Sequence, residues 1–278
     1  MTHWKLTLAY DGTTFRGWQI QPGLPTVQGL LADAIRRTVG ESVLPQGSGR
    51  TDAGVHALGQ VASFSLAAPI PAANLLRALN RCLPPSIRIL SAEIAPPDFH
   101  ARHSALRKTY EYRIFPLCVS PLEPRTSDPE PDLICPPTLA PYVWPCPWPL
   151  DLAALNQAAC HVLGTHDFTT FAAVDPDLAT RTDSEPAPPP IRTVTHSQWL
   201  AHDGLFLYRV TANGFLHHMV RNLVGTFVQA GAHRLSPESI PNLLAARNRA
   251  AAGPTAPARG LFLHSVEYDE QLENDRTK

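Results

Sequence analysis

Apolar and polar residues alternate from Lys5 to Tyr10, and this period of two predicts a β-strand with one buried face. Between residues 27 and 35 the apolar positions recur at helical spacing instead. Thr26 is a good N-cap for that segment and Gly40 a good stop, so an amphipathic helix is predicted there. The same reasoning predicts three more elements in this half of the chain: a strand at 60–66, a helix at 71–82 and a strand at 87–95.

A second series of elements starts with a strand from Lys108 to Phe115. It continues with a helix at 152–163, paired strands at 193–199 and 205–211, a helix at 215–230, a helix after Ser236-Pro237 and a strand at 261–268. We therefore predict an α/β (α+β) fold with two lobes, 1–105 and 106–278, each compatible with an open mixed sheet backed by helices. No repeat in the sequence relates the two lobes.

Two proline-rich insertions interrupt the second lobe. Eleven of the 29 prolines lie between Pro116 and Pro149, and a shorter insertion occupies 174–192. Proline removes a backbone donor and breaks both helices and strand ladders. Residues 116–150 and 174–192 are therefore predicted to be extended surface excursions.

The charge distribution decides whether a nucleic acid suits this chain as a partner. The net charge of −1 argues against phosphate binding when taken alone. The acidic residues are concentrated, however: the two insertions have net charges of −3 and −2, and the tail from Glu267 to Lys278 has −3. The rest of the chain therefore has a net charge of +7, which favours a nucleic-acid partner.

Composition and length set the broad class of protein. With 44% hydrophobic and 17% charged residues, the chain is in the ordinary globular range and is neither disordered nor fibrous. No window approaches 18 uninterrupted apolar residues, and the N-terminus enters a strand without a basic-then-apolar leader. We therefore expect a cytoplasmic protein with no membrane partner.

Disulfide and metal chemistry are not expected. The five cysteines are odd in number and form no CxxC pair, which argues against a disulfide framework and against a zinc site. His217-His218, and His161 with His166, lack a cysteine or carboxylate at plausible ligand spacing. We interpret these histidines as structural and predict no metal site.

The segment Gly47-Ser48-Gly49-Arg50-Thr51-Asp52-Ala53-Gly54-Val55-His56 is the main candidate for chemistry. Its glycines allow positive φ angles and leave room for a ligand against the backbone. Arg50 offers a phosphate or base contact, and Asp52 offers an acid, a base or a nucleophile. A turn with a capping aspartate explains the composition equally well, because Asp and Gly are ordinary turn residues.

Arg221 is a second candidate because it interrupts an apolar helix face. That face consists of Leu216, Met219, Val220, Leu223 and Val224. An arginine beside packed residues needs a carboxylate partner, and an aspartate paired with it would stay ionised and ready to attack. The alternative is an ordinary exposed surface arginine.

Residues 99–113 mix basic and aromatic side chains, a composition that suits RNA. Arginine and lysine neutralise phosphates, and aromatic faces stack on unpaired bases. The alternative is a solvated strand in which Tyr110 and Tyr112, on one face, belong to the core. The basic excess of the chain outside its acidic segments favours RNA.

Taken together, these segments resemble the tRNA pseudouridine synthase A (TruA) family, which isomerises uridines in the anticodon arm of tRNA. The resemblance rests on motifs in the family's order: Tyr10-Asp11-Gly12-Thr13 with Phe15, Gly17-Trp18-Gln19, Thr26-Val27-Gln28, Gly49-Arg50-Thr51-Asp52-Ala53-Gly54-Val55-His56, Phe99-His100-Ala101-Arg102, His166-Asp167-Phe168, Phe215-Leu216-His217-His218-Met219-Val220-Arg221-Asn222, and Thr255-Ala256-Pro257-Ala258 with Gly260-Leu261. It covers most of the chain outside the two insertions.

The resemblance implies a role for each candidate residue. Asp52 would be the catalytic aspartate and Arg221 the partner of its carboxylate. Tyr110 would sit against the target base, and Arg50 would help to displace that base. The resemblance also implies two related α/β lobes whose sheets flank a basic active-site cleft, no cofactor, and a homodimer in which both subunits grip each tRNA. The modified uridines would be those at positions 38, 39 and 40 of the tRNA.

Three features depart from the family's pattern. His103 stands where an aromatic residue is usual, Ser48 replaces a commoner alanine, and the two insertions have no counterpart. The first would weaken local packing or a base contact. None of the three involves Asp52.

The sequence leaves the mechanism and two rival functions open. An unprotonated Asp52 would attack C1′ of the ribose, add to C6 of the base, or abstract a ribose proton to give a glycal. A noncatalytic RNA-binding protein would use the same basic and aromatic residues without needing the Arg50-Thr51-Asp52 loop. A metal-dependent hydrolase would draw on the twelve histidines.

Overall fold

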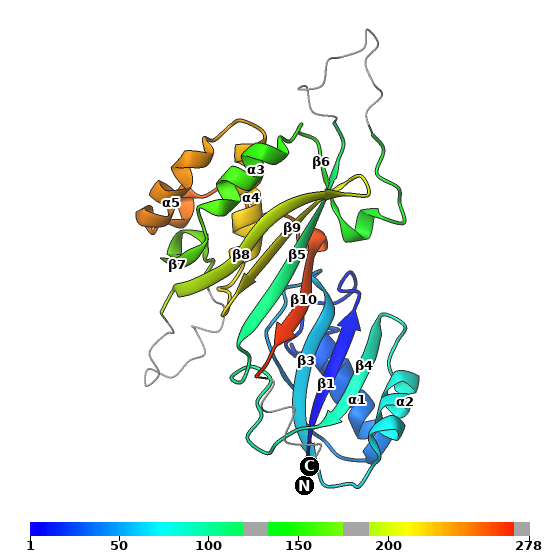
Figure 1. Cartoon of the computed structure of the whole chain (residues 1–278). Helices are drawn as coiled ribbons and strands as arrows, with labels where there is room; N and C mark the ends of the chain where they lie inside the picture. The colour runs from blue at the N-terminus through cyan, green and yellow to red at the C-terminus, as the bar shows by residue number, and fades with distance from the viewer. Residues whose placement is uncertain (119–132, 175–188, 270–278) are drawn as a thin grey trace. The chain divides into compact units, whose positions relative to one another are not determined.

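The computed structural model describes residues 1–118, 133–174 and 189–269. The chain forms two compact units, of which unit 1 is Met1–Thr109 with Phe262–Lys278 and unit 2 is Tyr110–Leu261. Residues 262–269 therefore group with the first unit, whereas the predicted second lobe spans 106–278. Each unit combines a sheet with helices, in agreement with the predicted α+β class (Figure 1).

Unit 1 is built on a sheet with the strand order β4-β1-β3-β10. These strands are β1 (Thr2–Tyr10), β3 (His56–Leu66), β4 (Ile87–Ile94) and β10 (Leu261–Glu267). β1 is antiparallel to both β3 and β4, and β10 runs parallel to β3 with Phe262 opposite His56. The alternation predicted in β1 is confirmed by its buried side chains, which are those of Trp4, Leu6, Leu8 and Tyr10.

Two helices, α1 (Val27–Val39) and α2 (Ala72–Cys82), pack against the sheet of unit 1 (Figure 1). The predicted caps of α1 are both present. The Thr26 hydroxyl accepts the Gly29 N–H at 3.4 Å, and Gly40 ends the helix with a φ of 78°. These local signals set the ends of α1 because each satisfies helix-terminal backbone groups.

The segment from Gln46 to His56, for which the sequence analysis predicts no strand, has regular structure at both ends. β2 (Gln46–Gly47) pairs antiparallel with β3, and β3 starts at His56 rather than at residue 60. The predicted start of this strand at residue 60 was wrong, because pairing with neighbouring strands outweighed the low strand propensity of glycine.

Unit 2 has a sheet with the strand order β5-β9-β8-β7, and β6 pairs parallel with β5. Its strands are β5 (Arg107–Pro116), β6 (Trp144–Cys146), β7 (Gly164–Asp167), β8 (Ile191–His202) and β9 (Leu205–Ala212). β8 and β9 form the predicted hairpin, which turns at Asp203 and Gly204 with φ angles of 50° and 75°. Trp199 and Tyr208 stack across this hairpin, with ring centroids 5.0 Å apart, in the core.

The helices of unit 2 are α3 (Leu152–Cys160), α4 (Met219–Gly231) and α5 (Ile240–Ala246). α3 packs on β8 and on α4, which is buried along most of its length. The prediction that α4 starts at residue 215 was wrong: His218 has a left-handed φ of 58°, so residues 215–218 cannot continue the helix. Pro241 causes no kink, because it lies in the first turn of α5.

Short 3₁₀ turns complete unit 2: η1 (Ala140–Tyr142), η2 (Thr169–Phe171), η4 (Pro237–Ser239), η5 (Arg249–Ala251) and η6 (Ala258–Gly260). Part of the longer insertion proves to be structural. β6 extends the sheet, and Val143 and Cys146 are fully buried, so residues 133–150 are not a simple surface excursion. The remainder of both insertions (119–132 and 175–188) and the acidic tail at 270–278 lie outside the described residues.

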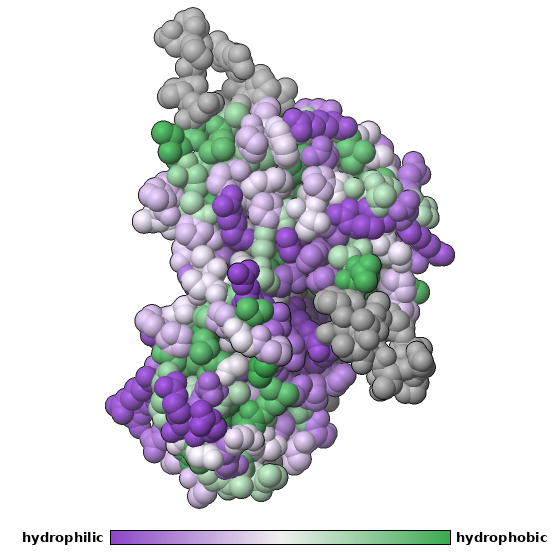
Figure 2. Space-filling view, turned by 180° about the vertical axis from the view of Figure 1, so that it is seen from behind, coloured by the Kyte–Doolittle hydropathy of each residue, from purple (hydrophilic) through white to green (hydrophobic). Residues whose placement is uncertain are grey.

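The surface is chemically mixed. Hydrophilic and hydrophobic residues are interspersed on the face shown in Figure 2. Within the described parts of the chain, none of the helices has both the length and the apolar character needed to cross a bilayer.

Candidate active site

Asp52 and Arg50 lie on the loop that joins β2 to β3 in unit 1. Burial differs sharply along this loop: Ser48 is completely buried and Thr51 nearly so, whereas Arg50 is exposed and Asp52 half-buried. The two side chains that could take part in a reaction, those of Arg50 and Asp52, are therefore ones that solvent or a ligand can reach. The buried Ser48 and Thr51 hold the loop in the protein.

Gln60, a fully buried residue of β3, holds the first half of this loop. Its Oε1 accepts hydrogen bonds from the Ser48 hydroxyl at 2.6 Å and from the Val61 N–H at 3.2 Å. Its Nε2 donates to the carbonyl oxygen of Gly49 at 2.9 Å. All these groups are buried or half-buried, and a buried polar group without a partner is costly, so Gln60 strongly favours this single loop conformation.

Tyr10 holds the second half of the loop from β1. Its hydroxyl is 2.7 Å from the Thr51 hydroxyl, and the Thr51 carbonyl accepts the Trp18 N–H at 3.0 Å. Burial raises the pKa of Tyr10 to about 12, although hydrogen bonds from the Thr51 and Gln60 side chains act in the opposite direction. The phenol therefore stays neutral at physiological pH and keeps its bond to Thr51, the residue immediately before Asp52.

The segment after β1 packs directly against this loop, and two of its glycines make the approach possible. A side chain at Gly12 would collide with the Val55 carbonyl, and one at Gly17, whose φ is 90°, would lie 2.5 Å from the Thr51 carbonyl oxygen. The sequence analysis gave neither glycine a role. The signal was available, because both belong to motifs that carried the family resemblance.

The glycines of the loop itself serve packing more than ligand approach. A Cβ atom on Gly47 would lie 2.5 Å from the Trp18 ring, so this glycine makes room for a tryptophan. Gly54 has a φ of 77°, as its expected turn role requires. His56 is buried and its ring stacks on Phe262 with centroids 4.6 Å apart.

Tyr110 and Tyr112 on β5 have different surroundings in unit 2. Tyr112 is fully buried, its hydroxyl donates to the Pro257 carbonyl at 2.7 Å, and burial raises its pKa above the ordinary tyrosine range. Tyr110 is also buried, and its ring meets Phe215 edge to face with centroids 5.0 Å apart. Phe215 belongs to the segment that leads into α4, so Tyr110 packs next to the start of that helix.

Glu111, between the two tyrosines, is a buried charge that the sequence analysis missed. Its two carboxylate oxygens accept hydrogen bonds from Arg113 Nε and Arg209 Nε, each at 2.8 Å. Burial by itself would raise the pKa of Glu111, but the hydrogen bonds and charges of the two arginines outweigh it and lower that pKa. Glu111 is therefore ionised, and it pairs with one of the arginines previously assigned to RNA.

The predicted basic segment 99–113 thus has several distinct roles. Lys108 Nζ donates to the Ser48 carbonyl at 2.5 Å and supports the loop that carries Asp52. Arg102 and Arg107 are exposed, as a phosphate contact requires. These two residues remain the best candidates in the segment for contacting a nucleic-acid backbone.

Arg221 lies in the first turn of α4 and is half-buried, so it is not the fully exposed arginine of the alternative interpretation. Its Nε donates to the Ala256 carbonyl at 2.8 Å, while the Ala256 N–H donates to the Arg221 carbonyl at 3.1 Å. This two-point contact restrains the guanidinium group. Asp52 belongs to unit 1 and Arg221 to unit 2, and their predicted pairing remains a prediction.

The loop can supply one carboxylate and one guanidinium group on a rigid support. A carboxylate at such a position can act as a nucleophile or as a base, and the neighbouring guanidinium group can bind a phosphate or a base edge. Rigid support matters because a reactive group acts efficiently only when its geometry is held in advance.

Comparison with known proteins identifies a family. A family model described as tRNA pseudouridine synthase matches residues 7–104 and 158–269. The matched ranges contain Arg50, Asp52 and Arg221, whereas Tyr110 lies in the stretch between them.

Individual relatives match almost the full chain. A tRNA pseudouridine synthase A from Solibacter usitatus is 46% identical over 265 residues, which cover 95% of this chain and 98% of the relative. The protein of the same name from Moorella thermoacetica is 46% identical over 267 residues, with coverages of 95% and 98%. A third, from Maridesulfovibrio salexigens, is 42% identical over 270 residues, with coverages of 96% and 90%.

Proposed function

The chain belongs to the tRNA pseudouridine synthase family, whose members isomerise uridine to pseudouridine in tRNA, and we propose that Asp52 is the catalytic carboxylate. The protein is accordingly an isomerase that acts on tRNA. The observation that carries the proposal for Asp52 is the loop around it. Ser48, Gly49 and Thr51 are each held by hydrogen bonds with Gln60 or Tyr10, and this leaves Arg50 and Asp52 as the accessible charged side chains of the loop.

The reaction itself needs no electron donor or acceptor. The N1–C1′ bond of uridine breaks, the uracil turns, a C5–C1′ bond forms, and the proton displaced from C5 is balanced by the proton gained at N1. One unprotonated carboxylate suffices for each of the three routes: attack on C1′, addition to C6, or removal of a ribose proton. No cofactor is required by this stoichiometry.

The other three residues assist that carboxylate. Arg221 pairs with Asp52 and keeps it ionised, and the support for this role is its half-burial and its restraint by Ala256. Tyr110 stacks on the uracil during its rotation. Arg50, exposed and two residues from Asp52, occupies the space that the displaced base vacates.

The substrate uridines are those of the anticodon arm, at positions 38, 39 and 40. Extracting a base from its stack costs roughly a few kcal/mol and costs least in loops and at arm junctions. The enzyme works as a cytoplasmic homodimer that grips tRNA with both subunits. Support for tRNA comes from the basic excess outside the acidic segments and from the exposed Arg102 and Arg107.

The test is Asp52→Asn, with Asp98→Asn as a matched control because Asp98 is an exposed aspartate of the same unit. Pseudouridine is measured by chemical labelling and sequencing of an unmodified tRNA after incubation with each purified variant. Asp52→Asn is expected to bind tRNA normally and to form no pseudouridine, whereas Asp98→Asn stays fully active. Turnover by Asp52→Asn would reject the assigned role. Tight tRNA binding without turnover by the unaltered protein would instead favour a noncatalytic RNA-binding function.

A second experiment addresses the substrate. Pseudouridines are mapped in tRNA from a strain that lacks this protein and from the same strain after the gene is restored. Loss of the modification at positions 38–40, with other pseudouridines unchanged, is the expected result. Loss at sites outside the anticodon arm would overturn the substrate assignment without touching the role of Asp52.

A further inference from the structure

Arg249, just after α5, fastens the following segment of unit 2 to helix α4. Its Nη2 donates to the Asn222 Oδ1 and to the Thr255 hydroxyl, each at 3.0 Å. Its Nη1 donates to the Gly253 carbonyl at 3.0 Å and more weakly to that of Ala252 at 3.5 Å. A single guanidinium group thus binds three residues of the segment 252–255 and one residue of α4.

The α4 side of this contact is also specific. Asn222 is fully buried, its Nδ2 donates to the Phe171 carbonyl at 2.7 Å, and its Oδ1 accepts the Thr255 hydroxyl at 2.7 Å as well as Arg249. A side chain at Gly225 would collide with the Pro254 carbonyl. The segment 252–255 therefore packs on α4 in a single well-defined position.

The segment ends at the contact with Arg221. Residue 256, which directly follows Thr255, accepts the Arg221 Nε–H at 2.8 Å and donates its own N–H to the Arg221 carbonyl at 3.1 Å. Because a guanidinium group is planar, a fixed acceptor at Nε restricts the plane in which its remaining nitrogens point. The position of this segment therefore restricts the orientation of the Arg221 guanidinium group.

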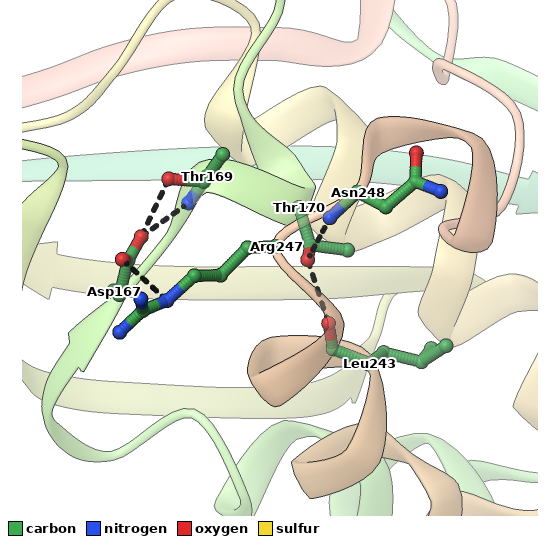
Figure 3. Close-up of polar contacts among 6 residues, drawn as sticks. All are labelled: Asp167, Thr169, Thr170, Leu243, Arg247 and Asn248. Carbon is green, nitrogen blue, oxygen red and sulfur yellow. Dashed lines mark hydrogen bonds and ion pairs between the residues drawn. The ribbon is translucent and has the colours of Figure 1, made fainter.

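The chain just before Arg249 is anchored to the turn after β7 (Figure 3). Arg247 Nε lies 3.0 Å from Asp167 Oδ2, and the Thr170 hydroxyl accepts the Asn248 N–H at 3.1 Å while donating to the Leu243 carbonyl at 2.6 Å. The Thr169 hydroxyl, by its hydrogen bond, lowers the pKa of Asp167, so this carboxylate is charged. The chain is thus held immediately before Arg249.

We propose that Arg249 is a positioning residue for the reaction. It holds residues 252–256 against α4 by hydrogen bonds, and through the Ala256 carbonyl it thereby orients the guanidinium group of Arg221. The inference rests on the proposed function of Arg221. It also gives a role to two motifs that had none, His166-Asp167-Phe168 and Thr255-Ala256-Pro257-Ala258. The first contains Asp167, which anchors Arg247 just before Arg249, and the second contains the contact of the segment with Arg221.

The test is a double-mutant cycle between Arg249→Gln and Arg221→Lys, read as the single-turnover rate of pseudouridine formation. Loss of the positioned contact is expected to slow Arg249→Gln about 10- to 100-fold, with tRNA affinity nearly unchanged. In the Arg221→Lys background, Arg249→Gln is expected to lower the single-turnover rate by less than about threefold, because the oriented guanidinium group of Arg221 is already absent. Arg234→Gln, an exposed arginine of the same unit that lies over the Trp148 ring, is the matched control and should react at the unaltered rate.

The possible outcomes distinguish the positioning role of Arg249 from the catalytic role of Arg221. An equal loss of rate in both backgrounds would mean that Arg249 acts on stability alone, and this overturns the inference while leaving Arg221 catalytic. Full activity of Arg221→Lys and of Arg221→Ala would overturn the role of Arg221, and the inference with it. Because Arg249→Gln removes several hydrogen bonds, Thr255→Val serves as a second variant if Arg249→Gln does not fold. Thr255→Val removes only a hydroxyl group with little change of shape. Its loss of single-turnover rate should be smaller and must likewise shrink in the Arg221→Lys background.

Discussion

Gln60 donates its side-chain amide to the carbonyl oxygen of Gly49 at 2.9 Å, and this bond connects the buried face of β3 to the loop that carries Asp52. The same side chain accepts the Ser48 hydroxyl. The first half of the loop that carries Asp52 is therefore held by a residue eight places after Asp52, which the sequence analysis did not consider.

Replacing Gln60 with leucine should impair both stability and catalysis. The Gly49 carbonyl would lose its donor inside the protein, which costs about 1–3 kcal/mol of unfolding free energy. The loop would also lose its restraint, and turnover is expected to fall about 10- to 100-fold. Urea unfolding and single-turnover rates check the two effects.

The control for this substitution is Ser48→Ala. Alanine is about the same size as serine, and Gln60 would still bond to Gly49 and Val61. Turnover within about twofold of the unaltered enzyme is expected, since only one of the bonds to Gln60 is lost. If Ser48→Ala is as damaging as Gln60→Leu, the bond to Gly49 is not what positions the loop.

Tyr10→Phe should change how stability depends on alkaline pH. Burial raises the pKa of Tyr10 from 10.0 to about 12 in the folded protein, so between these values the folded state keeps a proton that the unfolded state has released. Stability therefore falls as pH rises through this window. The phenylalanine variant lacks this proton and should show a shallower decrease in chemical-unfolding free energy between pH 10 and 12.

The comparison must allow for other tyrosines. Burial also raises the pKa of Tyr208 and of Tyr112, so some alkaline loss persists in the variant. At neutral pH, Tyr10→Phe is expected to cost about 1 kcal/mol for the lost bond to Thr51. An unchanged alkaline slope would show that Tyr10 does not titrate differently in the two states.

Glu111→Gln should reduce stability at neutral pH and weaken its dependence on acid. The carboxylate has a lowered pKa in the folded protein, so its contribution is present above its ordinary unfolded pKa and is lost as pH falls through the folded value. Thermal unfolding between pH 3 and 7 measures the difference. We expect a loss of about 1–3 kcal/mol at pH 7 that disappears in acid.

Glu93→Gln provides the comparison for that experiment. Glu93 forms a more exposed pair with Lys5, with 3.9 Å between Oε2 and Nζ, and such surface pairs contribute roughly 0–1 kcal/mol. If the two substitutions have equal effects at every pH, the buried position of Glu111 has no special energetic weight.

Excess chelator should leave pseudouridine formation unchanged. The proposed chemistry depends on a carboxylate and on hydrogen bonds, neither of which requires a metal. Activity that disappears in chelator and returns only with a divalent cation, on a tRNA whose folding is shown to be intact, would favour the metal-dependent alternative.

Features that depend on neighbouring residues were predictable from the sequence. The Arg50-Thr51-Asp52 loop is a candidate site by its composition and its family resemblance, and its chemistry stays a prediction. The ends of α1 follow from Thr26 and Gly40, and the burial of β1 follows from its alternation. Each is decided by backbone hydrogen bonding or side-chain direction over a few residues, so a local pattern is sufficient evidence.

Other features depended on contacts between residues far apart in the chain, and only the tertiary structure decided them. The pairing of β10 with β3, the burial of Glu111 between two arginines and the grip of Arg249 on α4 join segments that no periodicity connects. The left-handed His218 that delays α4 belongs with them, since a positive φ at a residue other than glycine is not a local preference of the sequence. The sequence by itself thus determined most of the helices and strands and the candidate reactive residues, while tertiary packing determined which buried groups hold those candidates in place.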